Sequence, residues 1–187
     1  MHQLSHLAIY TFLYLLGRAL MHTVSASRPI NSLAHSILSR IEALSIPTET
    51  GIIGVADGGV LEVAMPFQRI IAVDSPKTQL GYPEINLGIM PGYGGTGRTV
   101  RRIGVARTLE MVMTGRLVKA KEALEWGLVD ALVGDEDMLS GALKDMLVLD
   151  APADVSESEA DIAAAIKVAE EKYLARAHRY QDPTPFR

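Results

Sequence analysis

Glu62 and Glu84 are the residues of this sequence whose type and setting best suit acid–base chemistry. Each lies beside a glycine-rich segment, because Gly58 and Gly59 precede Glu62, and the glycines that begin at Gly92 follow Glu84. Two carboxyl groups around an apolar pocket can divide acid and base duties when burial and mutual repulsion separate their pKa values. The spacing alone leaves two solvated surface glutamates as the alternative interpretation.

The glycines before Glu62 predict a place where negative charge can develop. Where a strand leads into a helix, glycine lets the backbone approach a ligand closely, and the first N–H groups of the helix have no partner within it. Such N–H groups stabilise an oxyanion. Glu62 lies three residues beyond Gly59, so both face one side of a helix that begins near Gly59. The phosphate-binding motifs G-x-x-x-x-G-K-[ST] and G-x-G-x-x-G after a strand are not present in proper form.

The composition disfavours several other chemistries. The 187 residues include no cysteine, and the five histidines have no metal-binding spacing, so we predict no metal site. The serines lack the pattern of a nucleophile elbow, which disfavours a Ser-His-Asp hydrolase. A net charge of −4 disfavours nucleic acid as a partner. The helix expected after the second glycine-rich segment carries four arginines that could contact phosphates or another subunit, or simply form a solvated face: Arg98, Arg101, Arg102 and Arg107.

The elements that must position the glutamates follow from hydrophobic periodicity and turn residues. Apolar residues at three- and four-residue steps predict helices, β-branched apolar runs predict buried strands, and clusters of Gly, Pro and Ser predict turns. In chain order the sequence predicts a helix over 31–44, a strand over 50–56, a helix over 60–67, a strand over 69–73, a turn at 75–77, helices over 103–113 and 119–126, and a strand over 128–133.

The N-terminal part of the chain is apolar and differs from the middle. Residues 7–16 form a run of ten residues, whereas a helix that crosses a bilayer needs about 20, so we predict no membrane span. We expect the run to pack on the core or on a second subunit. A secretory leader that ends near Ala26 is the alternative, which is disfavoured because no Lys or Arg precedes the run.

The C-terminal part is acidic and predicts a long helix over 156–180, with Ser156 or Ser158 as its N-cap. These changes of composition divide the chain into a divergent apolar segment (1–30), a core (31–134) and an acidic helical region with a tail (135–187). The absence of cysteine is compatible with a reducing compartment, and a cytoplasmic location is our expectation.

Four linked stretches of the core resemble the enoyl-CoA hydratase/isomerase family, also called the crotonase family. The resemblance covers about residues 33–133, and the segment between the two glutamates is most similar to hydratase domains of multifunctional fatty-acid oxidation enzymes. The stretches are IEALSIPT (41–48), GVADGGVLEVA (54–64), PKTQLGYPEINLGIMPGYGGTGR (76–98) and TGRLVKAKEALEWGLVDALV (114–133).

The resemblance implies an α/β fold of repeated ββα turns wound into a spiral, here incomplete at the N-terminus and with added N- and C-terminal helices. It implies an acyl-CoA thioester as substrate, no cofactor apart from the CoA of the substrate, and a homo-oligomer, either a trimer or a hexamer. In hydratases of the family, the counterpart of Glu84 donates a proton to C2, and that of Glu62 helps to activate water. The counterpart of Gly59 donates its N–H to the thioester oxygen, and Gly58 and Gly92 join the expected substrate-binding residues.

This sequence also departs from the family pattern. The family's second oxyanion donor comes from an upstream segment patterned like Phe-x-Ala-Gly-Ala-Asp, which is not found in the 58 residues before Gly59. Asp57 stands where an apolar residue is usual, and Val60 where a glycine is usual. The two functional hypotheses are therefore a hydratase that acts on 2-enoyl-CoA and a catalytically impaired interaction or assembly module with the same fold.

Overall fold

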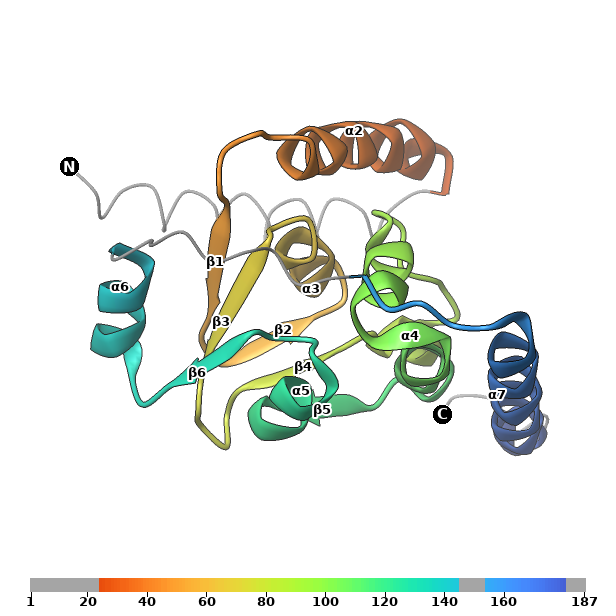
Figure 1. Ribbon diagram of the computed structural model, residues 1–187. Helices are drawn as coiled ribbons and strands as arrows, with labels where there is room; N and C mark the ends of the chain where they lie inside the picture. The colour runs from red at the N-terminus through yellow and green to blue at the C-terminus, as the bar shows by residue number, and fades with distance from the viewer. Residues whose placement is uncertain (1–23, 145–153, 181–187) are drawn as a thin grey trace, which may run out of the picture.

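The structure, a computed structural model, describes residues 24–144 and 154–180 (Figure 1). The apolar run at 7–16 lies outside the described residues. In chain order the elements are α2 (Val24–Glu42), β1 (Glu49–Ile52), β2 (Val55–Asp57), α3 (Gly59–Ala64), β3 (Arg69–Val73), β4 (Gln79–Gly81), the 3₁₀ helix η1 (Pro83–Leu87), α4 (Gly95–Thr114), β5 (Leu117–Lys119), α5 (Ala120–Trp126), β6 (Ala131–Val133), α6 (Glu136–Lys144) and α7 (Glu159–Tyr180). Across both described ranges, no helix has the length and hydropathy that crossing a membrane requires.

The first four strands alternate between two sheets, and a helix follows each of these two pairs of strands. β1, β3 and β6 form one three-stranded parallel sheet, whereas β2, β4 and β5 form a second sheet in which β5 is antiparallel to β4. The order β1-β2-α3 is repeated by β3-β4-α4, with η1 before the helix. Two strands and a helix per turn is the ββα spiral expected from the sequence, so the predicted α/β fold class is confirmed.

The register of the second sheet brings the two glutamate-bearing segments together. β2 and β4 run parallel, with Asp57 opposite Gly81. Because parallel strands end at the same edge of a sheet, the residues that follow β2 and those that follow β4 meet there. Glu62 lies on α3 directly after β2, and Glu84 lies on η1 directly after β4.

The single strand predicted over 50–56 is wrong, because this stretch forms β1 and β2, which belong to different sheets. Gly54 lies between them with φ of 73°, a left-handed conformation that breaks the extended chain and that glycine adopts without strain. The predicted strand over 69–73 is confirmed with the same bounds as β3. The predicted helix over 31–44 is confirmed in part, since α2 already begins at Val24 and crosses the boundary drawn at residue 30.

β3 lies between two apolar clusters, which explains its uninterrupted apolar sequence. Ile70 and Ala72 contribute to the main core, and Ile71 and Val73 pack on the other side with Leu139 of α6. Alternate residues of a strand face opposite sides of its sheet, so a strand covered on both sides needs apolar residues throughout.

Helix α4 is interrupted at Gly104, where φ is 79° and ψ is 171°. A short C-terminal segment closes both sides of this break. The Val155 N–H donates to the Arg101 carbonyl (2.7 Å), and Glu157 Oε2 accepts from the Val105 N–H (2.6 Å). Each helix end at the break therefore gains a partner for a backbone group that lacks one within the helix.

The start of α7 confirms Ser158, one of the two predicted N-caps. The Asp161 N–H donates to Ser158 Oγ (3.2 Å), and the Ser158 N–H donates back to Asp161 Oδ2 (3.4 Å). From this capped end α7 packs beside α4 (Figure 1). Gly127 ends α5 in the left-handed conformation that is common at helix C-termini.

Candidate active site

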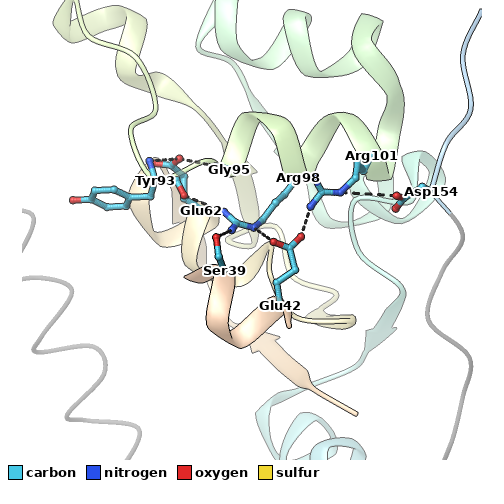
Figure 2. A network of polar contacts seen from close by, with 8 residues as sticks. All are labelled: Ser39, Glu42, Glu62, Tyr93, Gly95, Arg98, Arg101 and Asp154. Carbon is cyan, nitrogen blue, oxygen red and sulfur yellow. Dashed lines mark hydrogen bonds and ion pairs between the residues drawn. The ribbon is translucent and has the colours of Figure 1, made fainter. Parts of the chain in front are cut away.

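Glu62 is buried in α3, with 1% of its surface exposed, and its carboxylate accepts three backbone N–H groups. Gly92 donates to Oε2 (3.1 Å), and Tyr93 (2.8 Å) and Gly95 (2.8 Å) donate to Oε1. Figure 2 shows Glu62 beside Tyr93 and Gly95 at the start of α4. Three donors on one carboxylate favour its ionised form, which accepts on both oxygens.

Glycine at position 95 is a condition for this close approach. A Cβ on Gly95 would lie 2.5 Å from Glu62 Cγ and 2.8 Å from the Tyr82 hydroxyl, so no larger residue fits without displacing them. Tyr82 itself is buried, and its hydroxyl shares a hydrogen bond of 2.7 Å with Thr99 Oγ1. The glycine-rich segment therefore lets the backbone of α4 reach the Glu62 carboxylate.

Glu84 is also buried, with 9% of its surface exposed, but its setting is unlike that of Glu62. Within the described residues, Oε2 is buried and accepts no hydrogen bond. A Cβ on Gly58 would lie 2.8 Å from Oε1, which explains why glycine stands at this position, where φ is 52°. The carboxyl group of Glu84 thus lies against the turn that leads from β2 into α3.

The two carboxyl groups differ in their electrostatics as well. The pKa of Glu84 is raised to about 7, mainly by burial and also by the neighbouring charges of Glu62 and Asp57, against a backbone hydrogen bond that lowers it. The pKa of Glu62 is raised as well, because burial outweighs the N–H donors of Gly95, Tyr93 and Gly92 and the nearby His35, all of which lower it. At Glu62, three N–H donors thus oppose the effect of burial, whereas Glu84 has a pKa near 7 and is partly protonated at neutral pH.

The three glycines predicted to bind substrate occupy different positions. Gly59 is the first residue of α3, so its N–H has no acceptor within the helix, and a Cβ there would lie 3.1 Å from the Tyr93 ring. The Gly58 N–H donates to the Gly81 carbonyl (2.9 Å), and the Gly92 N–H donates to Glu62. The N–H groups of Gly58 and Gly92 therefore hold the site together, and Gly59 has the N–H available to an oxyanion.

The arginines proposed from the sequence as phosphate contacts are occupied by internal partners. Arg98 is buried and pairs with Glu42, and Arg102, which is partly buried, pairs with Asp130. Arg101 pairs with Glu42 as well, and Arg107 lies over the Trp126 ring, 5.5 Å from its centre. Arg98 and Arg102 therefore form neither a solvated face nor a phosphate site. Arg98 contacts α2, and Arg102 contacts the residues just before β3.

Sequence reasoning missed the polar side of α2, which faces the segment that holds Glu62. Only the apolar repeat was apparent, yet among the described residues Leu33 and Ile37 are exposed on this helix, and Leu38 is buried. The available signal was a second repeat at four- and three-residue steps, formed by the polar residues Asn31, His35, Ser39 and Glu42.

The described part of the chain has no group of three or more His, Asp or Glu residues arranged to hold a metal ion.

Asp57 has no basic ion-pair partner among the described residues, so its charge acts directly on Glu84. Two buried carboxyl groups and the first N–H of α3 form a combination suited to adding or removing a proton next to a carbonyl.

A ββα spiral with two buried glutamates at the edge of its second sheet defines a crotonase-fold protein. The chain belongs to the enoyl-CoA hydratase/isomerase family, whose sequence profile matches residues 21–184. Among curated proteins, the fatty acid oxidation complex subunit alpha of Shewanella loihica is 40% identical over 122 residues, which are 65% of this chain and 17% of that protein. The corresponding subunit of Shewanella amazonensis is 38% identical over the same length.

Solved structures agree with this assignment. An enoyl-CoA hydratase from Bacillus anthracis is 28% identical with a TM-score of 0.58, over 82% of this chain and 64% of that chain. An enoyl-CoA hydratase from Thermoplasma volcanium superposes with a TM-score of 0.63 over 88% of this chain and 67% of that chain, and its 24% identity shows the shared fold alone. The chain thus spans about a sixth of the length of the curated relatives that it matches.

Proposed function

We propose that this chain adds water to a 2-enoyl-CoA and forms a 3-hydroxyacyl-CoA. The observation that carries the proposal is the contrast between two buried glutamates, one held by three N–H donors and the other without a partner on Oε2. Membership of the enoyl-CoA hydratase/isomerase family supports an acyl-CoA thioester as the substrate. The similarity to fatty acid oxidation subunits supports an acyl chain of fatty-acid type.

In the proposed reaction, Glu62 is the base. A water molecule gives a proton to the Glu62 carboxylate, and its oxygen forms a bond to C3 of the substrate. The backbone donors at 92, 93 and 95 favour the ionised form of this carboxylate and fix its orientation before the proton arrives. A base held in this way does not need to reorganise during the reaction.

Glu84 is the acid in this reaction. As the water oxygen bonds to C3, the electron pair of the C2–C3 double bond moves towards the thioester, and C2 then takes the proton of Glu84. A pKa of about 7 leaves much of Glu84 protonated at neutral pH, which suits it to this step. The Gly59 N–H donates to the thioester oxygen while that oxygen carries the developing negative charge.

We further propose that the chain acts as a homo-oligomer, a trimer or a hexamer, at a cytoplasmic location and with no cofactor apart from the CoA of its substrate. Exposed apolar residues support association, namely Leu33 and Ile37 on α2, Leu44 just after this helix, and Leu87, Ile89 and Met90 after Glu84. Sedimentation at micromolar concentration tests this part of the proposal, because a clean monomer would contradict it.

The decisive experiment follows the loss of enoyl-thioester absorbance when purified protein is added to crotonyl-CoA. We expect turnover by the wild-type chain and a loss of about 100-fold or more in kcat for Glu62→Gln and for Glu84→Gln. Glu122→Gln is the matched control, since the Glu122 carboxylate pairs with Arg116, and this substitution should leave turnover unchanged.

Two results would contradict the proposal. A folded chain that neither turns over crotonyl-CoA nor binds acyl-CoA in titration calorimetry would favour the interaction or assembly module. Turnover that survives both glutamate substitutions would mean that other groups perform the chemistry.

A further inference from the structure

Helix α2 lies along the segment that supplies the Glu62 donors, and it contacts that segment at successive turns. A Cβ on Gly92 would lie 3.0 Å from Asn31 Nδ2, and a Cβ on Gly94 would lie 2.7 Å from His35 Cε1. One helical turn further on, Ser39 and then Glu42 contact Arg98. A single face of α2 therefore follows the chain from residue 92 to residue 98.

Arg98 is the main connection between this face and the site. It is 6% exposed, and its guanidinium group donates to three acceptors: Nε to Glu42 Oε2 (3.0 Å), one terminal nitrogen to Ser39 Oγ (3.3 Å) and the other to the Tyr93 carbonyl (3.0 Å). Figure 2 shows Arg98 between the two α2 side chains and the site. Its planar, forked set of donors serves acceptors in several directions at once.

Tyr93 joins this network to the carboxylate. Its carbonyl accepts from Arg98, while its N–H donates to Glu62 Oε1 at 2.8 Å. A peptide segment anchored at its carbonyl has less freedom at its N–H, so the Arg98 contact restricts the donors on either side of residue 93 as well. No other described side chain binds the Tyr93 carbonyl.

We propose that Arg98, held by Ser39 and Glu42 of α2, is a positioning residue that fixes the backbone donors around the Glu62 carboxylate. Arg98 touches no reacting atom in this arrangement. Its effect on turnover rests on the proposed function, whereas its effect on the Glu62 carboxylate does not.

Arg102 provides a matched control one turn along the same helix. It is also an enclosed arginine in an ion pair, with Asp130 (3.1 Å), and it donates to the Phe67 and Gln68 carbonyls (3.1 and 2.8 Å). None of these partners holds Glu62. Replacement of either arginine by lysine keeps the positive charge but removes the fork, so both variants lose similar packing and hydrogen bonds.

The test is a ¹³C NMR titration of the Glu62 carboxyl group, whose signal is assigned by its absence in Glu62→Gln. We expect Arg98→Lys to raise the pKa of Glu62, because looser N–H donors lower it less, and Arg102→Lys to leave it unchanged. The titratable and charged groups facing Glu62 stay the same in both variants: His35 on α2, Tyr82 before η1, Glu84 on η1 and Tyr93 in the glycine-rich segment.

Kinetics adds an independent readout. With crotonyl-CoA we expect Arg98→Lys to lower kcat by about 10- to 100-fold with little change in KM, and Arg102→Lys to change neither. Glu42→Gln, which keeps Arg98 but weakens its anchor, should shift the Glu62 pKa in the same direction and serves if Arg98→Lys does not fold.

An unchanged Glu62 pKa in the Arg98→Lys variant, or in Glu42→Gln where that variant replaces it, would overturn the proposal, as would an equal shift in Arg102→Lys. A shifted Glu62 pKa in a chain without any turnover would uphold the positioning role and count against the hydratase function alone.

Discussion

Replacement of Glu84 by glutamine should stabilise the protein at alkaline pH and not at acidic pH. The pKa of Glu84 is raised from 4.5 to about 7 by burial and by neighbouring negative charge. Between these two values the unfolded chain has released the proton and the native state still binds it, so the native state loses stability as pH rises. The favourable contribution of the protonated group is complete below about pH 4.5 and is lost as pH passes through about 7.

The size of the effect follows from the shift. One pKa unit corresponds to about 1.4 kcal/mol, so the raised pKa accounts for about 3 kcal/mol of unfolding free energy between pH 4.5 and pH 8. Glutamine has a similar shape and no charge at either pH. The difference in unfolding free energy between Glu84→Gln and wild type should therefore increase by about 2–3 kcal/mol in favour of the variant over this range.

Urea unfolding followed by circular dichroism at four pH values from 5 to 8 measures this difference. Glu122→Gln should respond in the opposite direction, because its hydrogen bond with Arg116 lowers the pKa of Glu122, and the contribution of this pair is present at neutral pH and lost on acidification. If the stability curves of wild type and Glu84→Gln ran parallel across this range, the burial and unpaired state inferred for Glu84 would be refuted.

Three further predictions concern the same site. The value of kcat/KM with crotonyl-CoA should fall above about pH 7, where Glu84 loses its proton, and steady-state kinetics from pH 5 to 9 would detect this fall. Asp57→Asn should lower the pKa of Glu84 by removing a like charge and move that fall to lower pH in the same assay. Gly95→Ala should cost about 1–3 kcal/mol through its clash with Glu62, whereas Gly97→Ala, whose Cβ meets nothing within 4 Å, should be neutral or stabilising in thermal unfolding.

The residues of the site were more predictable from the sequence than the strands that hold them. Glu62 and Glu84 could be selected as candidates from the sequence, because they are carboxylates that stand beside glycine-rich segments. The division between β1 and β2 could not be predicted, because their residues form one apolar run. The left-handed turn at Gly54 depends on which sheets the flanking residues join. Local periodicity carries no information on that choice.

Helix α2 illustrates a second limit. Its apolar repeat predicts an inward face, yet in the described residues Leu33 and Ile37 are exposed, and the polar residues that meet Arg98 face the site. Periodicity predicts that a helix has two faces, but it does not determine which one packs on a given neighbour. That choice depends on buried partners distant in the sequence, here an arginine 56 residues from Glu42.

The break in α4 has a consequence for the order in which the site can form during synthesis. Its two helix ends are satisfied by residues 155 and 157, about 50 residues after the break and more than 90 after Glu62. A nascent chain that has emerged only as far as α6 already contains both glutamates and all their donors, but its helix still lacks these two partners. Ribosome-bound chains halted before and after residue 157 should thus differ in protease resistance around Gly104, although the residues of the active site are identical in both.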